Sequence, residues 1–389
     1  MKDKLSVVFL SNFFNHHQKP FSDEMYRYLG DGYTFIETDT MKPEQKKLGW
    51  GMEGFPSYVV SREKFFSQRY FFEKLIDQAD VVITGSAPVS LTRKRIKENK
   101  LTFRYSERPL KRGMELWKYP VRFVRWHRNN PRSKNVYMLC ASAYTAGDYS
   151  KFGLFKHRCF KWGYFPETKR YNNIDDLLEK KTQNSLVWAA RYIDWKHPEI
   201  AVEVAKRLRQ DGYHFNLYMI GNGELQKKIQ KMVYDQELEE SVHIMGAMTP
   251  EEVRAHMEKA QIHIFTSDRQ EGWGAVLNEA MNSACVPVVN RNIGSAPYLI
   301  ANGKNGFHYQ NVDELYEKVK YLLDHKKERE SMARLAYSTI INEWNAEVAA
   351  ERFVQLCYAV KRNETLPFHT GPCSPDRGTD TIMKRLARE

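Results

Sequence analysis

The stretch from Gln261 to Asn290 combines two kinds of hydrophobic pattern. Its first apolar run, Ile262 to Phe265, has the composition of a short buried strand, and a turn with two glycines follows. Apolar residues then recur at helical spacing from Val276 to Ala284, which predicts a helix with one buried face. A second strand-like run, Cys285 to Val289, completes the unit. A strand, a helix and another strand in this order predict a parallel crossover, and hence an α/β fold.

The turn inside this unit suits a ligand that carries both negative charge and hydroxyl groups. Gly272 and Gly274 let the backbone approach a ligand closely, and the first N–H groups of the next helix favour an anion. Glu271 precedes the helix and Glu279 lies about two turns along it. Ionised carboxylates accept hydrogen bonds from sugar hydroxyls. A nucleotide sugar, with its sugar, diphosphate and ribose, matches all of these features.

The glycines, the two glutamates and the flanking strands together resemble the Glu-x7-Glu signature of retaining glycosyltransferases of family 4, which have the GT-B fold. The resemblance implies that Glu271 contacts the donor sugar as a catalytic residue and that Glu279 contacts the ribose. The donor-binding residues that it implies in the turn are Gly272, Trp273, Gly274, Ala275 and Val276.

Two cations, Arg191 and Lys196, follow the predicted strand Ser185–Ala190 and precede a predicted helix, Glu199–Asp211. A strand-to-helix loop of this kind lies at the ligand-binding edge of a parallel sheet. Fixed cations there suit a diphosphate, and Arg can bind phosphate oxygens in a bidentate way. Their spacing resembles the pair that grips the donor phosphates in family 4, which implies that both are catalytic and stabilise the leaving group.

Further donor contacts are predicted after the next two strands. Asn222 stands in a tight Gly-Asn-Gly turn, which is no dinucleotide fingerprint because Gln226 occupies the place of its third glycine. By resemblance, the backbone of Gly246 and Ala247 lies beside the nucleotide base.

The first predicted strand, Leu5–Leu10, runs into a polar loop at the ligand edge of a doubly wound domain. We expect the acceptor to bind here. The predicted acceptor-binding residues are Asn15, His16, Gln18 and Glu107. His17 is a candidate for removing the acceptor proton, since histidine titrates near neutral pH, although the sequence does not tell which of His16 and His17 faces the ligand. The loop residues could instead cap the next helix, and Glu107 could pair with Arg108.

The segment from Leu91 to Lys134 holds much of the positive charge. It contains fifteen Lys and Arg residues against three Glu, an excess of twelve that equals the formal net charge of the whole chain. Between Leu110 and Asn130 these cations interleave with aromatic residues, which predicts a basic helix. Such a helix is typical of an anionic membrane surface or a lipid-linked acceptor, and it could also bind nucleic acid. A solvated helix is the third interpretation, and nucleic acid is the least favoured.

Composition excludes several classes of protein. The five Cys residues include no CxxC pair and are odd in number, so we expect no disulfide framework, no zinc site and a reducing compartment. We find neither a signal-peptide pattern nor an apolar run long enough to span a membrane. We therefore expect a cytoplasmic protein, with peripheral attachment to the inner face of the membrane as an option. No Asp-x-Asp occurs, so we expect neither a bound metal nor another cofactor.

The chain of 389 residues is long enough for two domains. We predict an N-terminal acceptor-binding domain at 1–165, a linker at 166–184 and a donor-binding domain at 185–342. Residues 343–389 are predicted to form a helix that crosses back to the first domain, followed by a polar tail. The expected architecture is GT-B, with two Rossmann-like doubly wound parallel-sheet domains facing across a cleft.

The predicted function is metal-independent, retaining hexosyl transfer from a nucleotide-diphosphate sugar to an acceptor hydroxyl. UDP is the expected nucleotide from its frequency in the family, and the acceptor is a glycan or a lipid-linked glycan of a bacterial-type surface polysaccharide or glycolipid. One alternative is a UDP-sugar epimerase of the same fold, which would need no acceptor site. Another is a membrane- or nucleic-acid-binding protein with a degenerate nucleotide site.

Overall fold

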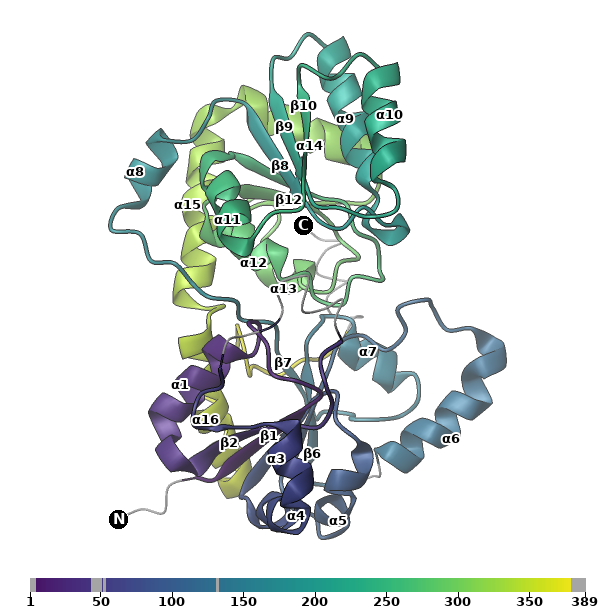
Figure 1. Cartoon of the computed structure of the whole chain (residues 1–389), viewed down its shortest axis with the longest axis vertical. Coiled ribbons are helices and arrows are strands. Elements are labelled where there is room, and N and C mark those ends of the chain that lie inside the picture. The colour runs from purple at the N-terminus through teal and green to yellow at the C-terminus, as the bar shows by residue number, and fades with distance from the viewer. Residues whose placement is uncertain (1–4, 43–50, 52–53, 131–132, 379–389) are drawn as a thin grey trace. The chain divides into compact units, whose positions relative to one another are not determined.

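The computed structural model describes residues 5–42, 51, 54–130 and 133–378. The chain divides into two compact units (Figure 1). Unit 1 contains Met1–Glu167 together with Asn345–Arg388, and unit 2 contains Thr168–Trp344. Residues 168–184 of the segment predicted as a linker belong to unit 2, where Ile174–Glu179 form helix α8.

The core of unit 1 is a seven-stranded sheet in the order β3-β2-β1-β4-β5-β6-β7, with every pair of neighbours parallel. Its strands are β1 (Val7–Ser11), β2 (Tyr33–Glu37), β3 (Val59–Val60), β4 (Val81–Thr84), β5 (Thr102–Ser106), β6 (Val136–Cys140) and β7 (Cys159–Lys161). The strand order reverses direction between β1 and β4. In doubly wound sheets this switch point opens a crevice outside the carboxyl ends of the strands, so the loop after β1 is in position to bind a ligand.

Seven α-helices of unit 1 surround this sheet among the described residues. They are α1 (Lys19–Leu29), α3 (Arg62–Ser67), α4 (Arg69–Gln78), α5 (Arg93–Lys97), α6 (Tyr119–Asn129), α7 (Thr145–Ser150) and α16 (Ala346–Arg362). Short 3-10 turns are η1 (Gly30–Gly32), η3 (Val89–Thr92) and η4 (Leu116–Lys118). Helices α1 and α16 pack on one face, where the ring of Phe9 contacts Phe21 at 6.3 Å and Phe103 contacts Phe353 at 5.1 Å between centroids.

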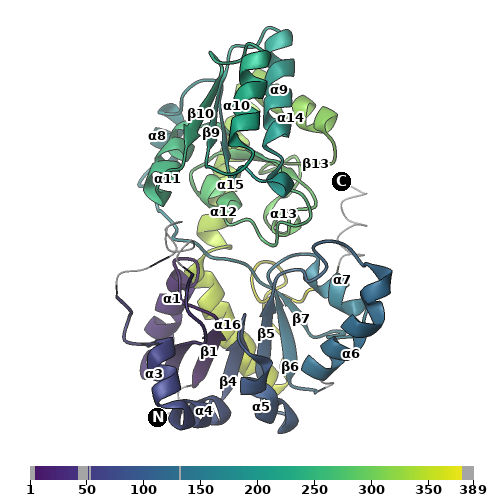
Figure 2. The same cartoon turned by 45° about the vertical axis from the view of Figure 1, so that its right-hand side comes forward.

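Helices α4 and α6 both cover the other face of the sheet. The residues Val82, Thr102 and Val136 are in register on adjacent strands, so their side chains point to the same side. Val82 packs in a core cluster with Phe72 of α4. Val136 packs in a second cluster with Trp126 of α6. Figures 1 and 2 show α4 beside α5, with α6 beyond α5.

Unit 2 is built on a six-stranded parallel sheet in the order β10-β9-β8-β11-β12-β13. Its strands are β8 (Ser185–Ala189), β9 (Asn216–Ile220), β10 (Val242–Gly246), β11 (Ile262–Phe265), β12 (Val286–Asn290) and β13 (Phe307–Tyr309). Besides α8, its helices are α9 (Pro198–Gln210), α10 (Gln226–Asp235), α11 (Pro250–Lys259), α12 (Val276–Asn282), α13 (Ala296–Leu299), α14 (Val312–Asp324) and α15 (Lys326–Asn342), and η5 (Asp194–Lys196) is a 3-10 turn. Here the strand order reverses between β8 and β11.

The predicted fold class, α/β with two doubly wound parallel sheets, is confirmed. Two local predictions are wrong. The pattern from Phe65 to Ala79 predicts one helix, but the backbone of Gln68 leaves the helical region at φ −118° and ψ 36° and divides it into α3 and α4. The basic helix predicted over 110–130 begins only near Leu116, because Gly113 and Glu115 adopt positive φ values of 89° and 42°.

The tail after α16 is described as far as Gly378, and the positions 379–389 lie outside the described residues. Its final described part runs antiparallel to the edge strand β7. The Cys373 N–H donates to the Lys161 carbonyl at 2.8 Å, and the Asp376 N–H donates to the Cys159 carbonyl at 2.8 Å. In the described part of the chain, no helix combines the length and the apolar character that a membrane crossing requires.

Candidate functional site

The predicted donor residues of unit 2 gather at the carboxyl edge of its sheet. Arg191 and Lys196 follow β8, and Glu271 follows β11. Because the strand order reverses between β8 and β11, these two loops flank the switch point where doubly wound sheets bind ligands. The structure therefore brings the predicted cations and the first predicted glutamate into one place.

Lys196 and Glu271 form a direct ion pair between the two loops. Their side chains are only 12% and 11% exposed, so the pair is largely removed from water. The Lys196 ammonium also lies 4.4 Å from the centre of the Trp195 ring. Arg191, by contrast, is exposed at the rim. One cation is thus held in place by protein contacts, while the other is open to an incoming ligand.

Hydrogen bonds hold the two loops at a fixed spacing. The Thr266 hydroxyl donates to the Lys196 carbonyl at 2.6 Å and accepts a bond from the Trp188 indole N–H at 2.7 Å. The Asp268 N–H donates to the Trp195 carbonyl at 3.0 Å. Since these groups sit on both loops, the Lys196 and Glu271 side chains are positioned by the surrounding backbone as well as by their own attraction.

His197 adds an ionic contact that the sequence analysis missed. Its backbone is left-handed, with φ 49° and ψ 56°. The ring nitrogens lie 2.9 Å from Glu199 and 3.6 Å from Asp268. The hydrogen bond to Glu199 and the charge of both carboxylates raise the pKa of His197. No motif marks this residue, and only its position beside Lys196 could have drawn attention to it.

The turn before α12 can be made only with glycine at one position. Gly274 has φ 87°, and a Cβ atom there would lie 2.7 Å from the Phe265 ring. The neighbouring Trp273 side chain is fully buried and donates to Asn278 at 2.9 Å, so this side chain does not face a ligand. Gly272 is also buried, whereas Ala275 and Val276 are half-buried. Helix α12 spans seven residues, which limits the dipole that the sequence predicts for this turn.

Glu279 lies on α12 with a half-buried side chain. Burial raises the pKa of this carboxyl to about 7, and the charge of Arg254 partly offsets that effect. Arg254 in turn donates to Asn282 at 2.9 Å. At neutral pH, Glu279 is therefore close to its titration midpoint, so contact with a hydroxyl-bearing ligand would favour the ionised form.

The remaining predicted donor residues line the open side of the sheet edge. Asn222 is exposed, and its carbonyl accepts a bond from the Tyr192 N–H at 2.8 Å. The Gly246 carbonyl accepts a bond from the Gly221 N–H at 2.7 Å, and Ala247 is exposed. The backbone of the loop after β10 is thus tied to the loop after β9.

In unit 1, the predicted acceptor residues form the loop after β1. The Gln18 side chain accepts a bond from the Asn15 N–H at 3.1 Å, and the Asn15 side chain accepts one from the His17 N–H at 2.9 Å. Asn15 is buried, and His16 lies beside His17 with 3.9 Å between ring centroids. The side-chain oxygens of Asn15 and Gln18 therefore bond within this loop, and among the described residues no side chain caps the N-terminus of α1.

Glu107 reaches the same loop through a residue that the sequence analysis did not select. Tyr164 donates from its hydroxyl to Glu107 at 2.6 Å, and its ring stacks on His17 at 5.7 Å. Glu107 pairs with Lys111 at 2.5 Å. Arg108, the alternative partner for Glu107, pairs with the buried Asp148 at 3.4 Å.

Burial lowers the pKa of His17 to about 3, and the neighbouring His16 adds to this effect. Burial also lowers the pKa of His16. Both rings are therefore neutral at physiological pH. Because the protonated form of His17 is disfavoured, this residue suits a role as a neutral hydrogen-bonding group better than a role as a base.

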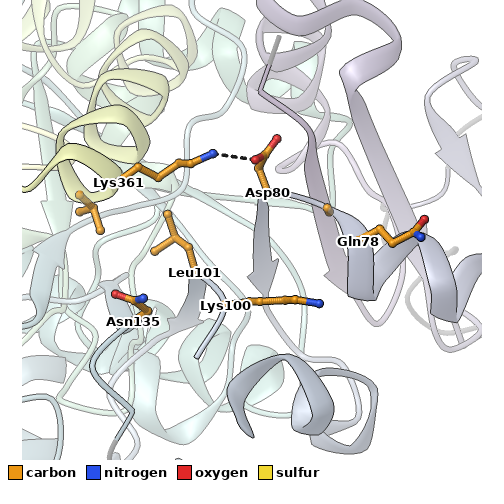
Figure 3. A pocket seen from close by; sticks show the side chains of 8 residues that line it. Gln78, Asp80, Lys100, Leu101, Asn135 and Lys361 are labelled. Atoms are coloured by element: carbon orange, nitrogen blue, oxygen red, sulfur yellow. Dashed lines mark hydrogen bonds and ion pairs between the residues drawn. The ribbon is translucent and has the colours of Figure 1, made fainter. Parts of the chain in front are cut away.

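A cavity of about 410 Å³ lies away from these loops, at the amino ends of β4, β5 and β6 (Figure 3). Lys361 extends toward Asp80 in this cavity and pairs with it at 2.6 Å. Lys100 pairs with Glu98 at 2.7 Å. Its cations are thus already neutralised, and its position is opposite to the ligand edge of the sheet. Within the described residues, no cluster of three or more His, Cys, Asp or Glu has the arrangement of a metal site.

Comparison with known proteins gives a match to a family model within unit 2. Residues 169–339 match the family model described as Glycosyl transferases group 1. An uncharacterized glycosyltransferase of Methanocaldococcus jannaschii is 27% identical over 42% of this chain and 45% of its own length. The amylovoran biosynthesis glycosyltransferase AmsK of Erwinia amylovora is 29% identical over 36% of this chain and 35% of its own length. The chain thus spans less than half the length of these curated relatives.

The solved structure of HepE from Anabaena in complex with UDP matches the fold with a TM-score of 0.67 and 12% identity, over 91% of this chain and all of that one. The two parallel-sheet units therefore have the GT-B fold. Residues 169–339 match the group 1 glycosyltransferase model, and the name of one partial relative assigns that relative to amylovoran biosynthesis.

Proposed function

We propose that this protein is a retaining glycosyltransferase that moves a sugar from a UDP-linked donor to a hydroxyl group of a glycan or lipid-linked glycan. The observation that carries the proposal is the buried ion pair of Lys196 and Glu271 at the switch point of unit 2. The group 1 domain over residues 169–339 supports sugar transfer. The UDP complex of HepE supports UDP as the nucleotide, and the name of the AmsK relative supports a polysaccharide product.

In this proposal, the donor diphosphate binds to Arg191 and Lys196. The approach of the diphosphate competes with Glu271 for the Lys196 ammonium, so the Glu271 carboxylate becomes available to accept hydrogen bonds from the donor sugar. Glu279 accepts hydrogen bonds from the ribose hydroxyls, and the backbone around Gly246 lies beside the base. Binding of the donor thus replaces the ion pair of Lys196 and Glu271 with a contact from Lys196 to the diphosphate and one from Glu271 to the sugar.

During transfer, the bond between the anomeric carbon and the diphosphate oxygen breaks, and the acceptor oxygen bonds to the same face of that carbon. The hydroxyl proton passes to a phosphate oxygen of the leaving diphosphate. Arg191 and Lys196 stabilise the negative charge that grows on this group, and such preorganised charges are commonly the largest contribution to catalysis. These cations supply the stabilisation that a bound metal gives in other enzymes. His17, whose pKa is lowered to about 3, orients the acceptor as a neutral ring.

The acceptor binds at the loop of Asn15 to Gln18 together with Glu107. The Glu107 carboxylate is fixed by Tyr164 and Lys111 and accepts hydrogen bonds from acceptor hydroxyls. The cationic segment 91–134 meets an anionic membrane surface, which would place the protein where lipid-linked acceptors occur.

The test is a transfer assay with a panel of nucleotide sugars and of free and lipid-linked glycans, in which NMR identifies the anomer of the product. We expect acceptor-dependent transfer with retention from a UDP-sugar. Lys196→Ala should lower kcat/KM by about a hundredfold or more, as for the loss of a group that stabilises the transition state. Lys231→Ala, at an exposed position on α10, is the matched control and should behave as wild type. Formation of a rearranged UDP-sugar without any acceptor would instead identify an epimerase.

A further inference from the structure

Helix α6 and the turn before it expose large apolar side chains. Leu116 is 79% exposed, Trp117 76%, Val121 69% and Val124 66%. On the surface of a globular protein, a contiguous patch of exposed apolar side chains commonly marks a site of interaction. The opposite side of the helix is anchored by the buried Trp126. The apolar side of α6 therefore faces away from the sheet.

A second exposed apolar cluster occurs on α3 and α4. Tyr70 is 82% exposed, Phe71 60% and Phe66 45%, while the flanking Phe65 and Phe72 are buried in the core. The Arg62 guanidinium lies 5.0 Å from the centre of the Phe66 ring. Helices α3 and α4 thus bury two of their aromatic side chains in the core and expose three others.

The two clusters lie on the same side of unit 1. Val82, in register with Thr102 and Val136, shows that α4 and α6 cover one face of the sheet. The outer surfaces of both helices therefore point away from that face. Helix α5 lies between α4 and α6 in both views (Figures 1 and 2).

The space between the clusters is cationic. Arg93, Lys94 and Lys97 of α5 are exposed, and Lys94 is tied to α4 by an ion pair with Asp77 at 2.5 Å. On α6, the exposed Arg125 and Arg128 accompany the apolar residues. The surface thus alternates apolar side chains that could insert with cations that could meet anionic groups.

We propose that this surface, called here the α3–α6 face, docks on an anionic lipid bilayer through two apolar anchors, Phe66–Phe71 and Leu116–Val124, on either side of the basic helix α5. This inference rests on the proposed membrane contact of segment 91–134 and extends it to α3 and α4, which lie outside that segment. Aromatic and aliphatic side chains enter the headgroup boundary, and cations attract anionic lipids. A protein partner fits less well, because the cores of protein interfaces are depleted in Lys.

The test measures sedimentation of the full chain with vesicles of phosphatidylcholine, with and without phosphatidylglycerol. Two double variants remove one anchor each, Tyr70→Ser with Phe71→Ser and Trp117→Ser with Val121→Ser. Tyr234→Ser with Leu335→Ser is the matched control, since these residues are 71% and 47% exposed on unit 2. Each anchor variant should lower the partition coefficient at least about tenfold, as expected for apolar side chains that leave an inserted state. The control should bind as wild type, and phosphatidylglycerol and low salt should strengthen binding.

Several outcomes would overturn the inference. Wild-type binding by the α4 variant would limit the contact to α6, and no binding of the wild type to either vesicle would remove the membrane contact altogether. Light scattering that shows a dimer dispersed by both anchor variants would assign the face to a second copy of the chain. Titration with UDP reports separately on the donor site, so a failed docking surface remains distinguishable from a failed glycosyltransferase assignment.

Discussion

Replacement of Glu279 by Gln should make the protein more stable and its nucleotide affinity lower. The folded-state pKa of Glu279 is about 7, against an ordinary value of 4.5. Between these values the folded state binds more protons than the unfolded state, so stability falls as pH rises through this range. The difference between the two pKa values corresponds to a loss of about 3.4 kcal/mol in the free energy of unfolding above pH 7. The side chain is only half-buried, and screening by solvent reduces the expected cost to about 2 kcal/mol.

The Glu279→Gln variant lacks this cost, because glutamine carries no charge at any pH. For a unit of this size, a gain of about 2 kcal/mol raises Tm by about 4 to 8 °C. The gain should be present in full at pH 8 and should vanish only near pH 4, where the carboxyl is protonated in both the folded and the unfolded state. Thermal unfolding of both proteins across this pH range measures the effect.

The same variant tests the predicted ribose contact. A carboxylate offers two acceptor oxygens to the ribose hydroxyls, whereas an amide offers one, so the affinity for UDP should fall about tenfold. Wild-type affinity should rise with pH through 7 as Glu279 ionises, and the variant should lose this dependence. Calorimetric titration with UDP at several pH values measures both changes.

Two results would refute the reasoning. An unchanged or lower Tm of Glu279→Gln at pH 8 would show that burial of this carboxylate carries no cost. Unchanged UDP affinity at every pH would remove Glu279 from the ribose site. Glu240→Gln is the control, because the Glu240 side chain is 85% exposed, and it should alter neither quantity.

Three further predictions concern other parts of the chain. His263 is fully buried in β11, its pKa is lowered to about 3, and among the described residues its ring nitrogens have no hydrogen-bond partner. Stability should therefore be lost as pH falls below 6.5, and His263→Leu should remove that loss in urea titrations at pH 5 and 7.5. Asp148→Ala leaves the buried Arg108 without its carboxylate and should cost about 3 to 5 kcal/mol in chemical denaturation, while Asp148→Asn should cost less. Lys196→Ala should weaken UDP binding and should also lower Tm, because it leaves the largely buried Glu271 carboxylate without its ion-pair partner. Two results would contradict the burial arguments for these residues. One is a His263→Leu variant whose stability still falls at low pH, and the other is an Asp148→Ala variant with the stability of wild type.

Elements with strong local signals were predictable from the sequence. The run Tyr33–Glu37 predicts a strand and has the bounds of β2, and α11 begins at Pro250 because Thr249 and Glu252 form a capping box. The bounds of α3 and α4 were not predictable, since the break at Gln68 depends on tertiary packing rather than on a helix-breaking residue.

The candidate site was predictable where the order of parallel strands brings loops together, and unpredictable where it depends on the contact of single side chains. The loops after β8 and β11 come together because parallel strands share one carboxyl edge, so Arg191, Lys196 and Glu271 could be placed near one another in advance. The contact of Tyr164 with Glu107 joins residues 57 positions apart and left no sequence signal. The pKa of Glu279 depends on how deeply the side chain is buried, which a helical pattern does not specify.

The membership of α16 in unit 1 affects how the chain folds during synthesis. Its residue Phe353 completes the face of the sheet that Phe21 and Phe103 begin, yet the ribosome adds it after all of unit 2. At usual rates of translation, the first 167 residues wait on the order of 10 to 40 s for this helix. Unit 2 is continuous in sequence and can fold during that interval. Unit 1 thus cannot complete this face of its sheet until α16 has left the ribosome.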